Sequence, residues 1–252
     1  MTDVLGYRRK LGIIIPSIAT VPQPEMEAMR TPGVTNHIGR VHVPALSLGG
    51  DSDHAALMQH IRAGTMDAID SVMTSQPDHL IVCTSGDTVR GGPTAAASFQ
   101  HEIEARTGLG VSMPGFALDA ALRALLGHAA RGAAIGLLTP YHPSGDRDSV
   151  IFFQALGYAV ERVEGLCLDN PVRFAHQDAD TLGRALDRLD GPDLGAIVQM
   201  GTNLPFAAMA ADEAARRGKP VLALNTALYW QALRACDIPD QIAGYGCLLE
   251  RF

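Results

Sequence analysis

The residue types best suited to chemistry come directly after a short apolar run, His79–Cys83. Cys83 offers a thiol, and Thr84, Ser85 and Gly86 follow it in the sequence CTSGD. Backbone N–H groups at such a turn, where a helix begins soon after, bind anions, and the same field lowers the pKa of a thiol. The two hydroxyl groups add donors for a carboxylate. The pattern predicts a reactive cysteine in an anion-binding turn; a buried, inert cysteine is the alternative.

A second turn, in the sequence QMGTN, also follows an apolar run, Leu194–Met200. Gly201 and Thr202 can donate hydrogen bonds from the backbone and from a hydroxyl group. Met200 has no acid–base capacity, so it can only shape a pocket. We expect Met200, Gly201 and Thr202 to bind substrate opposite the first turn.

Three further turn residues complete the predicted site. Tyr141, in the turn TPY, carries a phenol that can donate to a developing oxyanion, with a packing role as the alternative. Asn170 can donate an amide hydrogen bond to the same ligand, or form an Asx-turn before Pro171. Ser17 follows the run LGIIIP and is also expected to bind substrate. With one thiol, these donors predict a small pocket for a substrate that bears one or two carboxylates.

The elements that position these turns alternate between strand-like and helix-like patterns. Segments with apolar residues at a spacing of three to four, such as Ala55–Met73 and Phe206–Arg217, separate most of the apolar runs. This alternation is typical of βαβ units and predicts an α/β fold with mostly parallel sheets. The strand-like runs are 11–15, 41–48, 79–83, 110–113, 133–138, 158–163, 194–200 and 220–224.

The order of these elements repeats along the chain, which indicates an internal duplication. Ordinary α/β patterning could produce one or two such echoes by chance, but would produce four in register less readily. The echoing pairs are KLGIIIPS (10–17) with AIGLLTPY (134–141), VPALSLGGD (43–51) with VEGLCLDNP (163–171), PDHLIVCTSGD (77–87) with PDLGAIVQMGTN (192–203), and LGVSMPGFALDAALRALL (109–126) with KPVLALNTALYWQALRAC (219–236).

The duplication predicts two pseudo-symmetric α/β lobes with the active site in the cleft between them. We assign residues 1–110 and 226–252 to the first lobe and residues 111–225 to the second. The residues just after each strand, Gly49–Asp51 among them, should line the cleft. The proline-containing stretch 23–36 is expected to be the least ordered internal segment.

Charge and hydropathy exclude several classes of partner. The chain has 252 residues, with 20 Lys and Arg against 27 Asp and Glu, and a net charge of −7. This balance argues against binding to nucleic acid or to an anionic membrane surface. No apolar stretch resembles a signal peptide or a membrane span. We expect a cytoplasmic protein whose partner is a small carboxylate or dicarboxylate, and a homo-oligomer is the default expectation for such a protein.

Residue types also argue against a cofactor or a metal. The only two lysines, Lys10 and Lys219, each stand just before a strand-like run, whereas ligands of open α/β sheets bind beyond the carboxyl ends of the strands. A Schiff-base or P-loop lysine is therefore not expected. The four cysteines form no CxxC pair and the nine histidines form no HExxH motif, so no metal site is predicted.

The turns CTSGD, QMGTN and TPY, together with LGIIIPS and the following PxPEM, resemble the cofactor-independent aspartate/glutamate racemase superfamily. The nearest branch is that of the maleate cis-trans isomerases and arylmalonate decarboxylases, and the resemblance covers essentially the whole chain. It implies two α/β lobes, a site between them and no cofactor. The racemases place one cysteine in each lobe. Cys83 matches the first, but Met200 and Gly201 stand where the second is expected, which argues against two-base racemisation.

Both activities of the branch fit this chain in part. The maleate isomerases resemble it at Cys83, as nucleophile, and at Tyr141 and Asn170, but they carry an asparagine where this chain has Ala19. The arylmalonate decarboxylases hold a carboxylate with groups that match Thr84, Ser85, Tyr141 and Gly201. Their single cysteine, however, lies in the second turn, so this chain has the mirror arrangement.

Three hypotheses follow. In the first, a cofactor-free decarboxylase of a disubstituted malonate uses Cys83 as proton donor and gives the opposite product enantiomer to the usual enzymes. In the second, Cys83 adds to a cis-ene-diacid such as maleate and the chain is an isomerase. In the third, the chain is a ligand-binding relative that has lost the chemistry.

Overall fold

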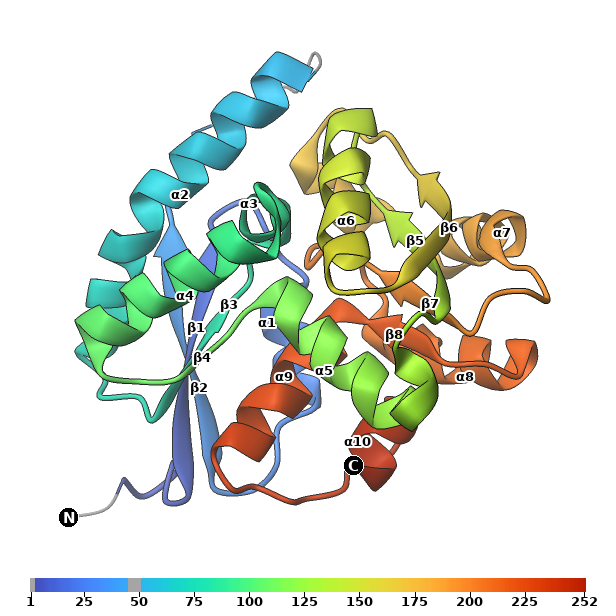
Figure 1. Cartoon of the computed structure of the whole chain (residues 1–252). Coiled ribbons are helices and arrows are strands. Elements are labelled where there is room, and N and C mark those ends of the chain that lie inside the picture. Colours follow the sequence, from blue (N-terminus) through green and yellow to red (C-terminus); the bar gives the residue numbers. More distant parts are fainter. Residues whose placement is uncertain (1–2, 45–50) are drawn as a thin grey trace.

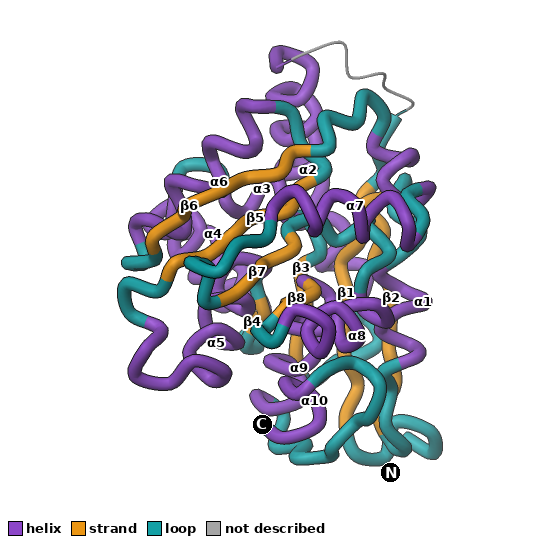
Figure 2. Tube along the Cα trace, turned by 90° about the vertical axis from the view of Figure 1, so that its right-hand side faces the viewer, coloured by secondary structure: helices purple, strands orange, loops and turns teal. Residues whose placement is uncertain are grey.

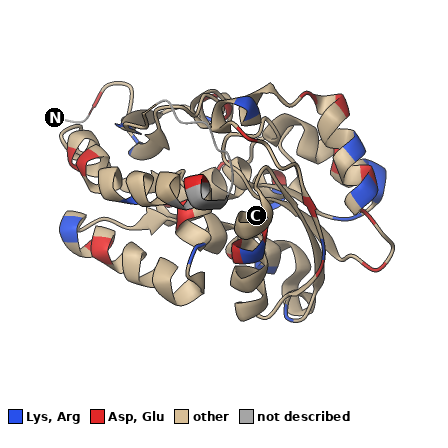
Figure 3. Cartoon of the chain, turned by 90° about the horizontal axis from the view of Figure 1, so that it is seen from above, with Lys and Arg blue, Asp and Glu red and all other residues tan. Residues whose placement is uncertain are grey.

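The structure, a computed structural model, describes residues 3–44 and 51–252, without the side chains of residues 51, 52, 54 and 55. Gly49 and Gly50, which we expected at the mouth of the cleft, lie outside the described residues, as does the side chain of Asp51. Acidic and basic residues are interspersed around the molecule (Figure 3). None of the described helices is long and apolar enough to cross a membrane.

Two parallel four-stranded sheets form the framework of the molecule (Figure 1). The first has the order β2-β1-β3-β4, from strands β1 (Arg9–Pro16), β2 (Val34–Val41), β3 (His79–Val82) and β4 (Val111–Ser112). The second has the order β6-β5-β7-β8, from strands β5 (Ala134–Thr139), β6 (Ala159–Gly165), β7 (Ala196–Gln199) and β8 (Val221–Ala223). Each order maps onto the other when four is added to the strand number, so the predicted two-lobed α/β fold with an internal duplication is confirmed.

Helices cover these sheets, and they begin where the local sequence favours it. Four of them carry proline in the first turn, where its missing N–H group is tolerated. The helices are α1 (Pro22–Ala28), α2 (Asp51–Met73), α3 (Ser85–Val89), α4 (Gly92–Thr107), α5 (Pro114–Leu126), α6 (Pro143–Ala155), α7 (Ala179–Leu189), α8 (Ala207–Arg217), α9 (Leu224–Ala235) and α10 (Cys247–Arg251), with the 3₁₀ turns η1 (Gly127–Ala130) and η2 (Pro171–His176).

Two local predictions are wrong. The strand expected at 41–48 corresponds to β2, which begins earlier, at Val34, and ends at Val41; residues 45–48 lie outside the described residues. The β2 sequence VTNHIGRV contains polar residues that hid it, and they are tolerated because β2 is an edge strand that is only partly buried. The stretch 23–36, which we expected to be the least ordered internal segment, is instead ordered. It contains most of α1 and the start of β2.

The two lobes share one apolar core. A single cluster of buried side chains includes Ile13 of β1 and Leu137 of β5. Helix α9 follows the last strand of the second sheet but contacts β3 and β4 of the first. Strand β4 pairs with β3, so the first sheet extends past residue 110. The lobes are therefore packed as one body, which fixes the turns of one lobe against those of the other (Figure 2).

Candidate active site

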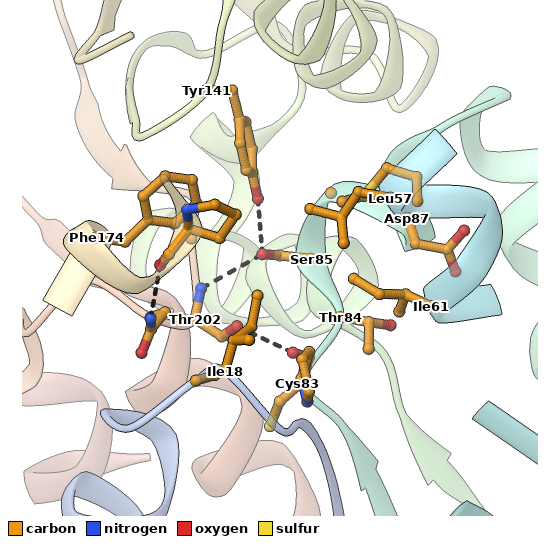
Figure 4. Close-up of a pocket in the computed structure, with 17 residues that line it drawn as sticks. Ile18, Leu57, Ile61, Cys83, Thr84, Ser85, Asp87, Tyr141, Phe174 and Thr202 are labelled. Atoms are coloured by element: carbon orange, nitrogen blue, oxygen red, sulfur yellow. Dashed lines mark hydrogen bonds between the residues drawn. The ribbon is translucent and has the colours of Figure 1, made fainter. Parts of the chain in front are cut away.

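A small cavity of about 60 Å³ lies between the two lobes, at the carboxyl ends of the strands. Figure 4 shows its residues converging from both lobes. Six of the predicted site residues line it, and they come from three separate turns. The lining comprises Pro16, Ile18, Ala19, Leu57, Met58, Ile61, Cys83, Thr84, Ser85, Gly86, Asp87, Tyr141, Pro171, Phe174, Gly201, Thr202 and Asn203.

Cys83 is placed by the end of strand β3. Its N–H group donates to the carbonyl of Ile14, at 2.8 Å, and helix α3 begins two residues later. The side chain has no exposed surface, and burial raises the pKa of the thiol well above its usual value. Our expectation of a lowered thiol pKa is therefore wrong for this structure, because desolvation outweighs the field of a short helix. Cys83 is a neutral thiol that can donate a proton.

Met200 is the structural counterpart of Cys83 in the second lobe. Its N–H group donates to the carbonyl of Leu138, at 2.8 Å, and Leu138 occupies in β5 the place that Ile14 occupies in β1. The alignment of the two turns, which the sequence left open, is thereby fixed. Met200 is fully buried in the apolar core and does not line the cavity, unlike our prediction.

Hydroxyl groups from both lobes meet at Ser85. The Ser85 and Tyr141 hydroxyl oxygens lie 2.7 Å apart, and the Thr202 N–H group donates to Ser85 Oγ at 3.3 Å. The Thr202 hydroxyl donates to the carbonyl oxygen of Cys83, at 3.0 Å. Burial raises the pKa of Tyr141, so its phenol stays protonated. This cluster supplies donors for one carboxylate or oxyanion.

Thr84 adds a buried hydroxyl that has no hydrogen-bond partner among the described residues. Such an atom is costly unless a ligand or water satisfies it. In Figure 4 its oxygen lies on the side of Ile61, and the Cys83 sulfur lies on the side of the loop that carries Ile18. The thiol and this hydroxyl therefore flank the Ser85 cluster rather than joining it.

Besides Met200, two predicted residues lie outside the cavity. Ser17 is exposed, and its hydroxyl oxygen accepts a hydrogen bond from the Val43 N–H group at 2.9 Å. The Asn170 side chain accepts from the Val172 N–H group, also at 2.9 Å, and so caps the turn η2. This hydrogen bond forms the Asx-turn that we named as the alternative for Asn170. Its neighbour Pro171 lines the cavity instead.

The sequence did not reveal the apolar wall of the cavity. Leu57, Met58 and Ile61 of α2 form most of it, with Ile18 and Phe174 (Figure 4). The helical spacing of these side chains is visible in the sequence, but periodicity does not show what a helix face covers. In Figure 4 Leu57 and Ile61 lie on one side of Ser85 and Phe174 lies on the other, so apolar side chains flank the hydroxyl cluster.

Asp87 is a buried acidic group that also lines the cavity. Its carboxylate pairs with Arg62 of α2 at 2.9 Å, and the Arg62 guanidinium stacks 3.4 Å from the centre of the Phe99 ring. Burial raises the pKa of Asp87 to about 6, although Arg62 acts in the opposite direction. The pair ties α2 to α3, and so holds the apolar wall against the Cys83 turn.

Among the residues that the structure describes, no three metal-ligand side chains are grouped as a metal site requires. Comparison by sequence found no family model and no curated protein that match the chain.

Comparison with solved structures found close matches to the fold. Maleate cis-trans isomerase of Nocardia farcinica, bound to TRIS, superposes with a TM-score of 0.86 at 19% identity, over 96% of this chain and 98% of that one. A cysteine-to-serine mutant of the same enzyme, with a covalently bound succinylcysteine intermediate, gives 0.85 at 21% identity, over 97% and 99%.

A mutant arylmalonate decarboxylase in the liganded form is also similar, with a TM-score of 0.80 at 19% identity, over 95% of this chain and 98% of that one. That mutant has cysteine in place of a glycine and serine in place of a cysteine. Both kinds of enzyme thus share the arrangement of the two lobes along nearly the whole length. The chain therefore has the two-lobed fold seen in maleate cis-trans isomerase and in arylmalonate decarboxylase.

Proposed function

We propose that this chain is a cofactor-independent decarboxylase of a small malonate-type diacid that carries an apolar substituent. The observation that carries the proposal is the composition of the cavity. Its lining combines one thiol, that of Cys83, with a hydroxyl cluster for one carboxylate and an apolar wall. Maleate has no apolar substituent, whereas a disubstituted malonate has one carboxylate to be held, one to be lost and an apolar group to be covered.

The reaction balances with the groups present. The substrate C–C bond breaks to release carbon dioxide, and its electron pair forms an enediolate. Ser85, Tyr141 and the Thr202 N–H group donate to the enediolate oxygens. The Cys83 thiol then gives its proton to the carbon, and the resulting thiolate takes a proton from water. The raised thiol pKa suits this role, since the thiol must be protonated before the step.

The apolar wall supports the bond-breaking half of the reaction. A carboxylate beside Leu57 and Ile61 would be poorly solvated, and its loss as neutral carbon dioxide removes that cost. Because Cys83 occupies the first-lobe turn, protonation is expected from the face opposite to that used by the decarboxylases with a second-lobe cysteine.

The test is carbon dioxide release from a panel of phenylmalonate-type and alkylmalonate-type acids, followed by chiral analysis of the products. We expect carbon dioxide release that depends on Cys83. The product enantiomer should be opposite to that formed by the decarboxylases with a second-lobe cysteine. The matched control is Cys167→Ala, because Cys167 is an exposed cysteine outside the cavity. No release across the panel would count against the proposal.

A maleate isomerase is the second candidate, and one observation favours it. Cys83 stands in the turn where the resemblance places the nucleophile of the isomerases, and one neighbour in the structural comparison contains a succinylcysteine intermediate. Conversion of maleate to fumarate, with an adduct of Cys83 trapped by mass spectrometry, would identify this activity. Turnover of neither substrate class, with ligand affinity retained in Cys83→Ala, would instead indicate a binding protein.

A further inference from the structure

Helix α8 of the second lobe is capped by a residue of the first lobe. The residue before it, Phe206, has no side chain that can accept a hydrogen bond from the helix. Glu25 of α1 does so instead, since its Oε1 accepts from the Phe206 and Ala207 N–H groups, both at 2.9 Å. The first N–H groups of a helix lack partners within the helix, and they favour a negative charge. Glu25 therefore joins the lobes at the start of α8.

The second oxygen of Glu25 leads to the candidate site. Glu25 Oε2 accepts from Asn225 Nδ2 at 2.7 Å, and the same Asn225 nitrogen donates to the carbonyl of Thr202 at 2.8 Å. All three groups that face the Glu25 carboxylate are thus donors. They lower the pKa of Glu25, whereas burial raises it and is the larger effect. Glu25 is thus connected through Asn225 to Thr202. Thr202 in turn hydrogen-bonds to Ser85 and to the carbonyl of Cys83.

Asn203 reinforces the same connection. Its side-chain oxygen accepts from the Thr20 and Val21 N–H groups, at 2.9 and 3.1 Å, and its amide donates to the Pro171 carbonyl at 3.0 Å. The second-lobe turn is thus held by the Asn203 side chain, which binds backbone N–H groups of the segment after β1, and not by a helix of its own. The first-lobe turn differs, because α3 begins within it.

We propose that Glu25 is a positioning residue: from the first lobe it fixes the turn Gly201–Asn203 against Cys83 and keeps the cavity closed around the thiol. The part of this inference that concerns turnover rests on the proposed function. The part that concerns closure does not, since it can be read from the accessibility of Cys83, which is fully buried.

The experiment measures alkylation of Cys83 by iodoacetamide in the intact, folded chain, with each cysteine followed separately by peptide mass spectrometry. In Glu25→Gln the side chain keeps one acceptor oxygen, but its new NH₂ group faces an N–H donor that the carboxylate had accepted from. We expect Cys83 to be labelled about tenfold faster, the ratio that loss of a helix cap of ordinary strength gives in an opening equilibrium. The exposed Cys167 serves as internal reference, and its rate should not change.

Two control variants separate positioning from general loss of stability. Glu27→Gln removes an exposed carboxylate from the same helix, where it pairs with Arg30. Asp178→Ala removes the cap of α7, a helix of the second lobe that is capped by its own residue, through Thr181. Both should leave Cys83 labelling within about twofold of the unmodified chain. Asn225→Ala, which cuts the link from Glu25 to Thr202, should reproduce the effect of Glu25→Gln and replaces it if that variant does not fold.

Equal labelling of Cys83 in Glu25→Gln and in the unmodified chain would overturn the inference, as would an equal increase in Asp178→Ala. If decarboxylation is found, Glu25→Gln should lower kcat/KM about tenfold without shifting its pH profile. An increase in labelling without turnover in any assay would keep the positioning role and reject the proposed reaction.

Discussion

The turns Cys83–Asp87 and Met200–Asn203 occupy the same place in the two lobes but are built differently. In both, the residue after the strand donates its N–H group to the neighbouring strand, at 2.8 Å. The first turn continues at once into α3, whereas the second passes through a loop before α8. The first contains the thiol, and the second contributes backbone and side-chain donors. The duplication preserved the backbone frame and left each copy free to take a different part of the site.

The backbone at the next position shows the same divergence. Thr84 has a φ of −117°, but its counterpart Gly201 has a φ of +137°, where a side chain would be strained. A Cβ atom on Gly201 would also lie 2.8 Å from the Pro140 ring. The second turn thus approaches Pro140 more closely than any residue other than glycine permits.

The largest effect is expected at the thiol of the first turn. Cys83→Ala removes the proposed proton donor and should lower decarboxylation about a thousandfold, the range of a positioned acid or base. Carbon dioxide release measures it. Cys236→Ala, at a second buried cysteine outside the cavity, is the control for loss of a buried thiol. A Cys83→Ala variant that retains activity would show that the first turn does not supply the proton donor.

The second expected effect concerns the glycine of the second turn. Gly201→Thr gives this turn the residue of the first, and strain at φ +137° together with the clash with Pro140 should lower the free energy of unfolding by about 3 kcal/mol. Urea denaturation measures the change. Thr84→Gly, the reverse exchange in the first turn, should cost about 1 kcal/mol. Equal losses of unfolding free energy in the two variants would mean that both turns require the same backbone conformation at this position.

A third effect tests the hydroxyl cluster that joins the two turns. Tyr141→Phe removes the phenol that contacts Ser85 and should reduce kcat/KM about thirtyfold, the cost of losing one oxyanion donor of moderate strength. Steady-state kinetics measure it. Tyr158→Phe is the matched control, because the Tyr158 hydroxyl donates to Asp119 at 2.7 Å away from the cavity. Equal reductions in both variants would point to stability as the cause.

The smallest effect concerns the contribution of Asp87, in the first turn, to the pH dependence of stability. Burial raises the pKa of Asp87 to about 6 from its ordinary 3.8, so its stabilising contribution is present below pH 4 and is lost as the pH rises through 6. Relative to Asp87→Asn, the unmodified chain should lose about 2 kcal/mol of unfolding free energy between pH 4.5 and 7.5.

Urea denaturation at the two pH values measures this difference. Asp190→Asn, which replaces a second-lobe carboxylate that Arg217 and Lys219 hold at a lowered pKa, should keep the pH dependence of the unmodified chain over this range. If Asp87→Asn and the unmodified chain show the same slope, the Asp87 carboxyl does not titrate near pH 6.

Sequence patterns predicted the parts of this molecule that depend on local periodicity. Strands β1, β3, β5 and β7 lie where the apolar runs indicate, and the echoing segments became equivalent strands of two equivalent sheets. Cys83 and Tyr141 were expected at one cavity because parallel strands bring their carboxyl ends to the same edge, and both line it. Strand β2 was misplaced because an edge strand needs no continuous apolar pattern.

The sequence by itself determined the duplicated α/β fold, the single thiol at a strand end and the hydroxyl groups beside it, because these follow from the order and spacing of residues. Only the tertiary structure decided that Cys83 is a neutral buried thiol, that Met200 belongs to the core and that α2 forms the apolar wall. Only it showed that Glu25 caps a helix of the other lobe. Burial and pairing depend on residues far apart in the chain, and no local pattern records them.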